Sequence, residues 1–188
     1  MNSKTKKLAQ TALLLAICLL SQYFKNLSVY IAGPIINACL ILCVLAVGLP
    51  WAAILCVITP ITAFFIAGSP IMAGIPLMFP AIMAGNFILV LFAWIFEKRT
   101  HLRFRLPIGL IAGSVCKGLF MGLVIVGVLL PVFGNNISSH LPKPEALPGV
   151  LAAARTTFSV TQLITALIGS LLAYIIWLPL KKYLKNET

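Results

Sequence analysis

Long apolar stretches of the chain contain a few polar side chains that could bind a small molecule. Asn37 and Asn86 carry carboxamides, and Lys117 carries an amine near the middle of an apolar run. These groups can form hydrogen bonds with a ligand. If the stretches cross a membrane, each polar group there is costly and is a candidate for function.

Acidic side chains are nearly absent from the chain. Glu97, Glu145 and Glu187 are predicted to lie in loops or in the tail, and the sequence contains no aspartate. His101 and His140 also fall in predicted loops, so a membrane hydrolase that uses a histidine base or a metal has no obvious residues for it. We therefore expect no enzyme, no cofactor and no metal site. Without intramembrane carboxylates, coupling to protons or sodium is disfavoured, and a ligand should be neutral or anionic.

The composition identifies the class of protein. Of the 188 residues, 61% are hydrophobic and only 9% are charged, and the mean hydropathy is +1.10. Soluble domains are about one quarter charged, and disordered chains are poor in apolar residues, so both classes are excluded. A spanning helix takes ~20 residues. We predict an all-α integral membrane protein with six transmembrane helices, in which residues 1–188 form one transmembrane domain.

Six apolar stretches are predicted to cross the membrane, at residues 8–24, 31–48, 51–67, 79–96, 106–132 and 158–180. The segment between Gly68 and Pro80 is too rich in glycine and proline to form one regular helix. Irregular backbone at membrane depth is tolerated where it is buried in protein or lines a cavity. The longest connection, residues 133–157, is predicted to be extended because it contains three prolines.

The distribution of positive charge predicts the orientation. The chain has 14 lysines and arginines and a formal net charge of +11, which could suggest a nucleic-acid partner. In a chain this apolar, the charge is better explained by the enrichment of lysine and arginine in cytoplasmic loops. A cytoplasmic N-terminus places ten of them inside and three outside. We therefore predict a multi-pass protein of the cell membrane, with both termini cytoplasmic and no nucleic-acid partner.

In this orientation several polar residues share one outer layer. Asn37 and Asn86 lie ~9 and ~10 Å below the outer surface, at 1.5 Å per helical residue. We predict an outward-facing pocket whose substrate-binding residues are Gln22, Lys25, Asn37, Asn86, Lys117 and Gln162, with Arg155 and Thr161 close by. Two alternatives stay open. The amides could instead join neighbouring helices, and Lys117 could be uncharged or capped by backbone carbonyls.

Three alanines form a smooth face on the first predicted helix. Ala9, Ala12 and Ala16 follow the spacing i, i+3 and i+7, which places them on one side. Small residues allow another helix to approach closely. This helix could be a neighbour within the chain or a helix of a partner protein.

The whole chain resembles the substrate-binding S component of an energy-coupling factor (ECF) transporter. The resemblance is in length, six spans, the Ala12-x-x-x-Ala16 pattern and the segments SQYFK (21–25), GPIIN (33–37), Pro80 and Gly85-Asn86. It implies a subunit that binds a vitamin or related micronutrient from outside. It also implies that the alanine face docks on a transmembrane coupling subunit that carries two ATPases. The chain lacks the GxxxxGK[ST] phosphate loop, so a partner must hydrolyse ATP. The alternatives are a small self-sufficient permease or channel and, less favoured, a membrane-embedded enzyme or assembly factor.

Overall fold

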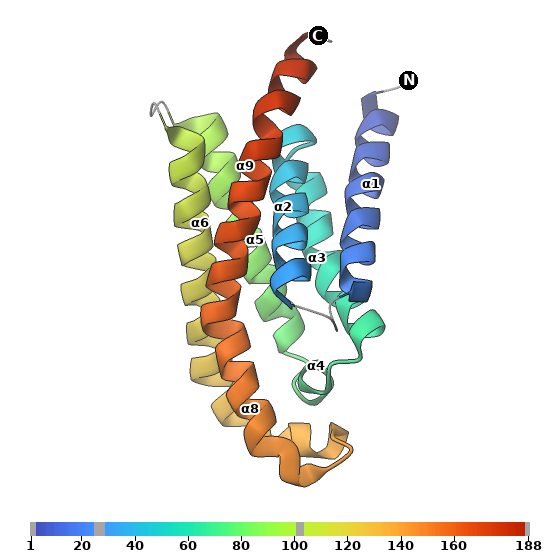
Figure 1. Cartoon of the computed structure of the whole chain (residues 1–188), viewed down its shortest axis with the longest axis vertical. Coiled ribbons are helices and arrows are strands. Elements are labelled where there is room, and N and C mark those ends of the chain that lie inside the picture. The colour runs from blue at the N-terminus through green and yellow to red at the C-terminus, as the bar shows by residue number, and fades with distance from the viewer. Residues whose placement is uncertain (1–2, 25–28, 101–103, 187–188) are drawn as a thin grey trace.

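The protein is a bundle of long helices. The structure is a computed structural model that describes residues 3–24, 29–100 and 104–186. Within these ranges it is almost entirely helical and contains no strand. The long helices are α1 (Ser3–Tyr23), α2 (Val29–Ala46), α3 (Leu49–Ala67), α5 (Met78–Arg99), α6 (Arg105–Met121) and α9 (Gln162–Asn186). Figure 1 shows these helices running along the long axis of the molecule.

Shorter elements close one end of the bundle. The one-turn helix α4 (Pro70–Gly74) joins α3 to α5. The π-helix η2 (Gly122–Leu129) and α7 (Leu130–Phe133) extend α6. They lead into η3 (Gly134–His140), η4 (Pro144–Ala146), α8 (Leu147–Thr156) and the π-helix η5 (Thr157–Thr161), which continues into α9. In Figure 1, α4 and α8 lie at the end opposite to the one where α1 begins and α9 ends.

Five helical segments of the described chain are long and apolar enough to cross a membrane, which confirms a multi-pass membrane protein. They are Val29–Ala46, Leu49–Ala67, Met78–Arg99, Arg105–His140 and Pro144–Tyr183. α1 is not among them, because lysines at its start and polar residues at its end lower its mean hydropathy. The sixth span and the cytoplasmic termini stay predictions. An even number of crossings is consistent with α1 beginning at the end of the bundle where α9 ends (Figure 1).

Two predictions about connections have different outcomes. The segment from Gly68 to Pro80 is irregular as predicted: Gly68 ends α3 in the left-handed conformation (φ 57°), and α4 and a turn follow. The extended conformation predicted for residues 133–157 is wrong, because η3, η4 and α8 occupy most of it. Pro144 and Pro148 stand in the first turns of η4 and α8, where a missing N–H breaks no intrahelical bond.

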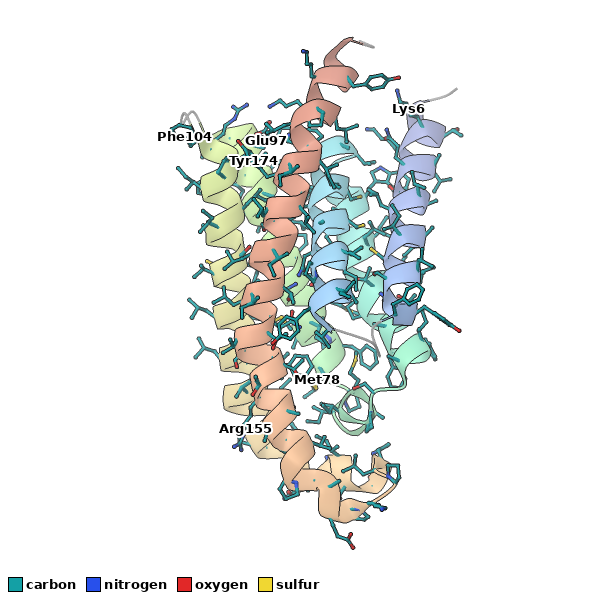
Figure 2. The ribbon with its side chains drawn as sticks, in the orientation of Figure 1. Lys6, Met78, Glu97, Phe104, Arg155 and Tyr174 are labelled. Carbon is teal, nitrogen blue, oxygen red and sulfur yellow. The ribbon has the colours of Figure 1, made fainter. Side chains whose placement is uncertain are left out.

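The core consists of two apolar clusters at different levels of the bundle. One cluster joins α2, α3, α5, α6 and α9 and includes Leu40, Leu55, Leu89, Val90, Leu110 and Trp177. The other lies toward α4 and α8 and includes Ile75, Met78, Met121, Ile125, Ile137 and Phe158. In Figure 2, Glu97 and Tyr174 lie in the half of the bundle toward which α9 ends, and Met78 and Arg155 lie in the other half. A polar layer between the two clusters is available for a ligand site.

Glu97 clamps three helices at the end of the bundle where α9 ends. It lies inside α5 and is buried, which corrects the prediction that it belongs to a loop. Lys181 Nζ of α9 lies 2.6 Å from Glu97 Oε1, and Arg105 Nε of α6 lies 3.4 Å from Oε2. α5 extends further than predicted, and the two cations compensate the charge of its carboxylate.

We expect Glu97→Gln to destabilise the protein by ~1 kcal/mol. The substitution removes both ion pairs, but the two cations are 39% and 50% exposed, so solvent screens much of the interaction. Chemical unfolding of the purified protein in detergent measures the change. Glu145→Gln is the matched control, because Glu145 is exposed on η4. Equal stability of the two variants would contradict a stabilising role of the two ion pairs of Glu97.

Candidate functional site

A cavity of ≈ 130 Å³ lies between α2, α3, α5, α6 and the start of α9. α4 and η5 contribute to its wall, so the cavity lies in the half of the bundle toward α4. Its polar lining residues are Asn37, Thr59, Ser69, Asn86, Lys117, Thr157 and Gln162. The remaining lining is apolar. In the part of the chain that the structure describes, no group of three or more His, Cys, Asp or Glu side chains could hold a metal ion.

Lys117 brings two of the predicted residues together. Its Nζ donates hydrogen bonds to Asn37 Oδ1 at 2.6 Å and to Asn86 Oδ1 at 2.8 Å. The three side chains come from α6, α2 and α5 and are 2%, 3% and 5% exposed. This triangle, which we call the Lys117 triad, forms the polar layer between the two apolar clusters. The structure thus brings together three of the residues that the sequence predicts for one pocket.

The chemistry of lysine fixes the orientation of both carboxamides. An ammonium group has three donors and no acceptor, so each asparagine must turn its oxygen toward Lys117. Each Nδ2 group is then directed elsewhere. Among the described residues, the side-chain hydrogen bonds of the three residues are the two that join Lys117 Nζ to the asparagine oxygens. All three residues line the cavity, so the triad presents the ammonium group and two carboxamide NH₂ groups as hydrogen-bond donors to a ligand.

Glycines bring the helices of the triad close together. A Cβ on Gly169 of α9 would lie 2.6 Å from Asn37 Cβ and 2.7 Å from the Pro34 carbonyl oxygen of α2. A Cβ on Gly85 of α5 would lie 2.9 Å from Met121 Cγ. Contacts below 3.0 Å require a shift of the neighbour, so the two glycines permit the close packing that positions the asparagines.

The other predicted site residues are distributed differently. Gln162 is half-buried and lines the cavity. Gln22 is buried and donates from Nε2 to the Thr59 carbonyl oxygen at 3.0 Å, so it joins α1 to α3 and does not line the cavity. Thr161 is also outside the lining, and Arg155 is exposed on α8 (Figure 2). Lys25 lies outside the described residues.

Several lining residues were not predicted from the sequence. Thr59 precedes Pro60, and a proline inside a helix removes a backbone hydrogen bond, which is a signal for an irregular site in a membrane helix. Thr157 and Phe158 belong to η5 and line the cavity together with Gln162, the first residue of α9. In a π-helix the backbone bonds connect residues i and i+5, so Thr157 and Gln162 face the same side. A sequence carries no clear signal for this wider turn.

The alanine face of α1 is exposed. Ala9, Ala12 and Ala16 face away from the bundle, whereas Thr11 and Cys18 of the same helix are buried. Packing within the described chain therefore does not account for the small residues on this face.

Comparisons with known proteins give one match. A family model described as "ECF transporter, substrate-specific component" matches residues 6–180. Among curated proteins and solved structures, no match was found.

Proposed function

Because the chain belongs to the family of substrate-specific components of ECF transporters, we propose that the cavity above the Lys117 triad is its substrate site. The family consists of substrate-binding subunits of membrane transporters and is not an enzyme family. We propose that this chain binds a vitamin-like small molecule from outside and releases it inward when docked on its coupling subunit. The two ATPases of the assembled transporter would supply the energy.

The observation that carries this proposal is the buried Lys117 triad at the floor of the cavity. Polar groups buried in a membrane protein are costly and mark ligand pathways. Here three helices supply an amine and two amides to one level, and all three residues line the cavity. The apolar cluster that contains Leu40, Leu55 and Leu89 fills the bundle beyond the triad. This filling favours a binding subunit over a channel.

We propose that the α4 end of the bundle faces outward, with both termini cytoplasmic. The ten-to-three distribution of lysine and arginine supports this orientation. Cysteines introduced at Asn2 and Asn186 should resist a membrane-impermeant thiol reagent in intact cells, whereas one at the exposed Ser139 should react. The unmodified chain is the control for its five native cysteines. Labelling at either terminus would contradict the orientation.

Filling the cavity tests the site directly. Ala63 of α3 lines the cavity, and a phenyl ring takes up most of a cavity of this size, since one of about 150 Å³ holds a benzene molecule. We expect Ala63→Phe to lower the amount of co-purifying small molecule at least about tenfold, which corresponds to ~1.4 kcal/mol. Mass spectrometry of molecules released by denaturing the purified protein measures this amount.

Val57→Phe is the matched control for this experiment. Val57 lies on the same helix, is 46% exposed and does not line the cavity. The control should retain the small molecule at the level of the unmodified chain. Equal retention by the Ala63 variant would place the substrate elsewhere.

A further inference from the structure

We propose that the ligand meets the Lys117 triad with a single carboxylate, so the substrate is an organic acid whose inner part is about the size of one ring. This inference rests on the proposed function, because it concerns the substrate class of the same cavity. It depends on three properties of the site: its charge, its donor set and its size.

Lys117 is not paired with an acid of the described chain. Glu97 is paired with Lys181 and Arg105 at the other end of the bundle, and Glu145 is exposed on η4. The asparagine oxygens accept hydrogen bonds from Lys117 but carry no charge. A buried cation without a counter-ion is unfavourable, so a ligand that brings one negative charge to Nζ gains more than a neutral one.

The donor set selects a carboxylate among the possible ligand groups. An ionised carboxylate only accepts hydrogen bonds and has about four acceptor positions on two oxygens. It can therefore accept from the third proton of Lys117 and from the Nδ2 groups of Asn37 and Asn86. A primary amide has one acceptor oxygen and no charge to compensate Lys117, and an ammonium group would be repelled by Lys117. One lysine compensates one charge, so a doubly charged phosphate fits less well.

The walls of the cavity favour a mainly apolar body for this acid. Beyond the triad, most lining residues are apolar, among them Ala32, Ile36, Met72, Ile82 and Phe158, and polar side chains come from Thr59, Ser69, Thr157 and Gln162. The volume of ≈ 130 Å³ is comparable to the cavity of about 150 Å³ that holds benzene in another protein. The buried part of the substrate is therefore a ring or a branched aliphatic group attached to the carboxylate.

Matched acid and amide probes test the charge requirement. The purified full chain in lipid nanodiscs is titrated with benzoate and benzamide, and with cyclohexanecarboxylate and its amide, by calorimetry or by competition with the co-purified molecule. Each pair has one shape and differs in charge. We expect the better-fitting acid to bind at least tenfold more tightly than its amide.

Two variants add an internal counter-ion to the triad. Asn37→Asp and Asn86→Asp are nearly isosteric, and each places a carboxylate next to Lys117 Nζ. We expect either variant to lower acid binding at least tenfold and to remove the preference for acid over amide. Asn135→Asp adds the same charge at an exposed position of η3 and should leave the preference unchanged. Folding of each variant is checked by its elution as a single species and by its thermal transition.

The outcomes separate this inference from the proposed function. Equal affinity for acids and amides, or an acid preference that survives both aspartate variants, would overturn the inference. A co-purified molecule without a carboxylate would also overturn the inference. If this molecule were lost in Ala63→Phe, the cavity would remain the substrate site. Absence of both a co-purified molecule and any probe binding would count against the proposed function itself.

Discussion

Replacing Ala12 or Ala16 with tryptophan is expected to abolish substrate uptake while leaving substrate binding to the isolated protein unchanged. Both alanines are exposed on α1, and with Ala9 they form a face that no described element of the chain covers. The family of the chain implies a membrane partner that couples transport to ATP hydrolysis. If a helix of this partner docks on the alanine face, an indole ring prevents the close approach that small residues allow.

Uptake in cells that express the complete transporter, compared with ligand binding to the purified variants, measures this effect. Ile17→Trp is the matched control, because Ile17 is 40% exposed on the same helix but points about 100° away from Ala16. The control should retain uptake. Normal uptake by both alanine variants would rule out docking through this face, since the chain itself does not require these residues to be small.

The level of the site could be predicted from the sequence, but its pairings could not. Counting residues from the outer ends of two apolar runs places Asn37 and Asn86 at one depth, and the structure brings them to the same amine. Their depth follows from the constant rise of a helix. Which face each side chain occupies depends on how the helices rotate, and this rotation is set by contacts such as that between Gly169 and Asn37.

The same limit explains the residues that the sequence misplaced. Gln22 lies at the predicted level, but its amide bonds to the Thr59 carbonyl oxygen and joins two helices. The Gln22 amide therefore fits the alternative in which amides join neighbouring helices better than it fits substrate binding. Polar composition alone cannot distinguish a residue that faces a cavity from one that faces a backbone carbonyl.

Local sequence patterns also misled where prolines begin a helix. Three prolines in residues 133–157 suggested an extended connection, yet Pro144 and Pro148 start helical turns. Proline is unfavourable only inside a helix, and its fixed φ suits the first turn. The helical connection matters for the site, because η5 and the start of α9 carry Thr157, Phe158 and Gln162 into the cavity wall.

The largest effect on affinity is expected at Lys117. Lys117→Met removes the only charged group that lines the cavity within the described chain, and it keeps an unbranched side chain of similar length. Hydrogen bonds to charged groups contribute about 1.5–3 kcal/mol, roughly twice the value for neutral pairs. We therefore expect the dissociation constant of the substrate to rise about 100-fold for Lys117→Met. For Asn37→Ala and Asn86→Ala we expect a rise of about tenfold, or ~1.4 kcal/mol.

Dissociation constants measured on purified protein, together with thermal unfolding of the same samples, distinguish binding from packing. If the triad only joined helices, the three variants would lose stability and keep their affinity. Lys182→Met is the matched control, because Lys182 is exposed on α9 and lies far along that helix from Gln162, so its affinity should equal that of the unmodified chain. Dissociation constants that stay unchanged in Lys117→Met, Asn37→Ala and Asn86→Ala would place the substrate outside the cavity, most plainly in the outer loops.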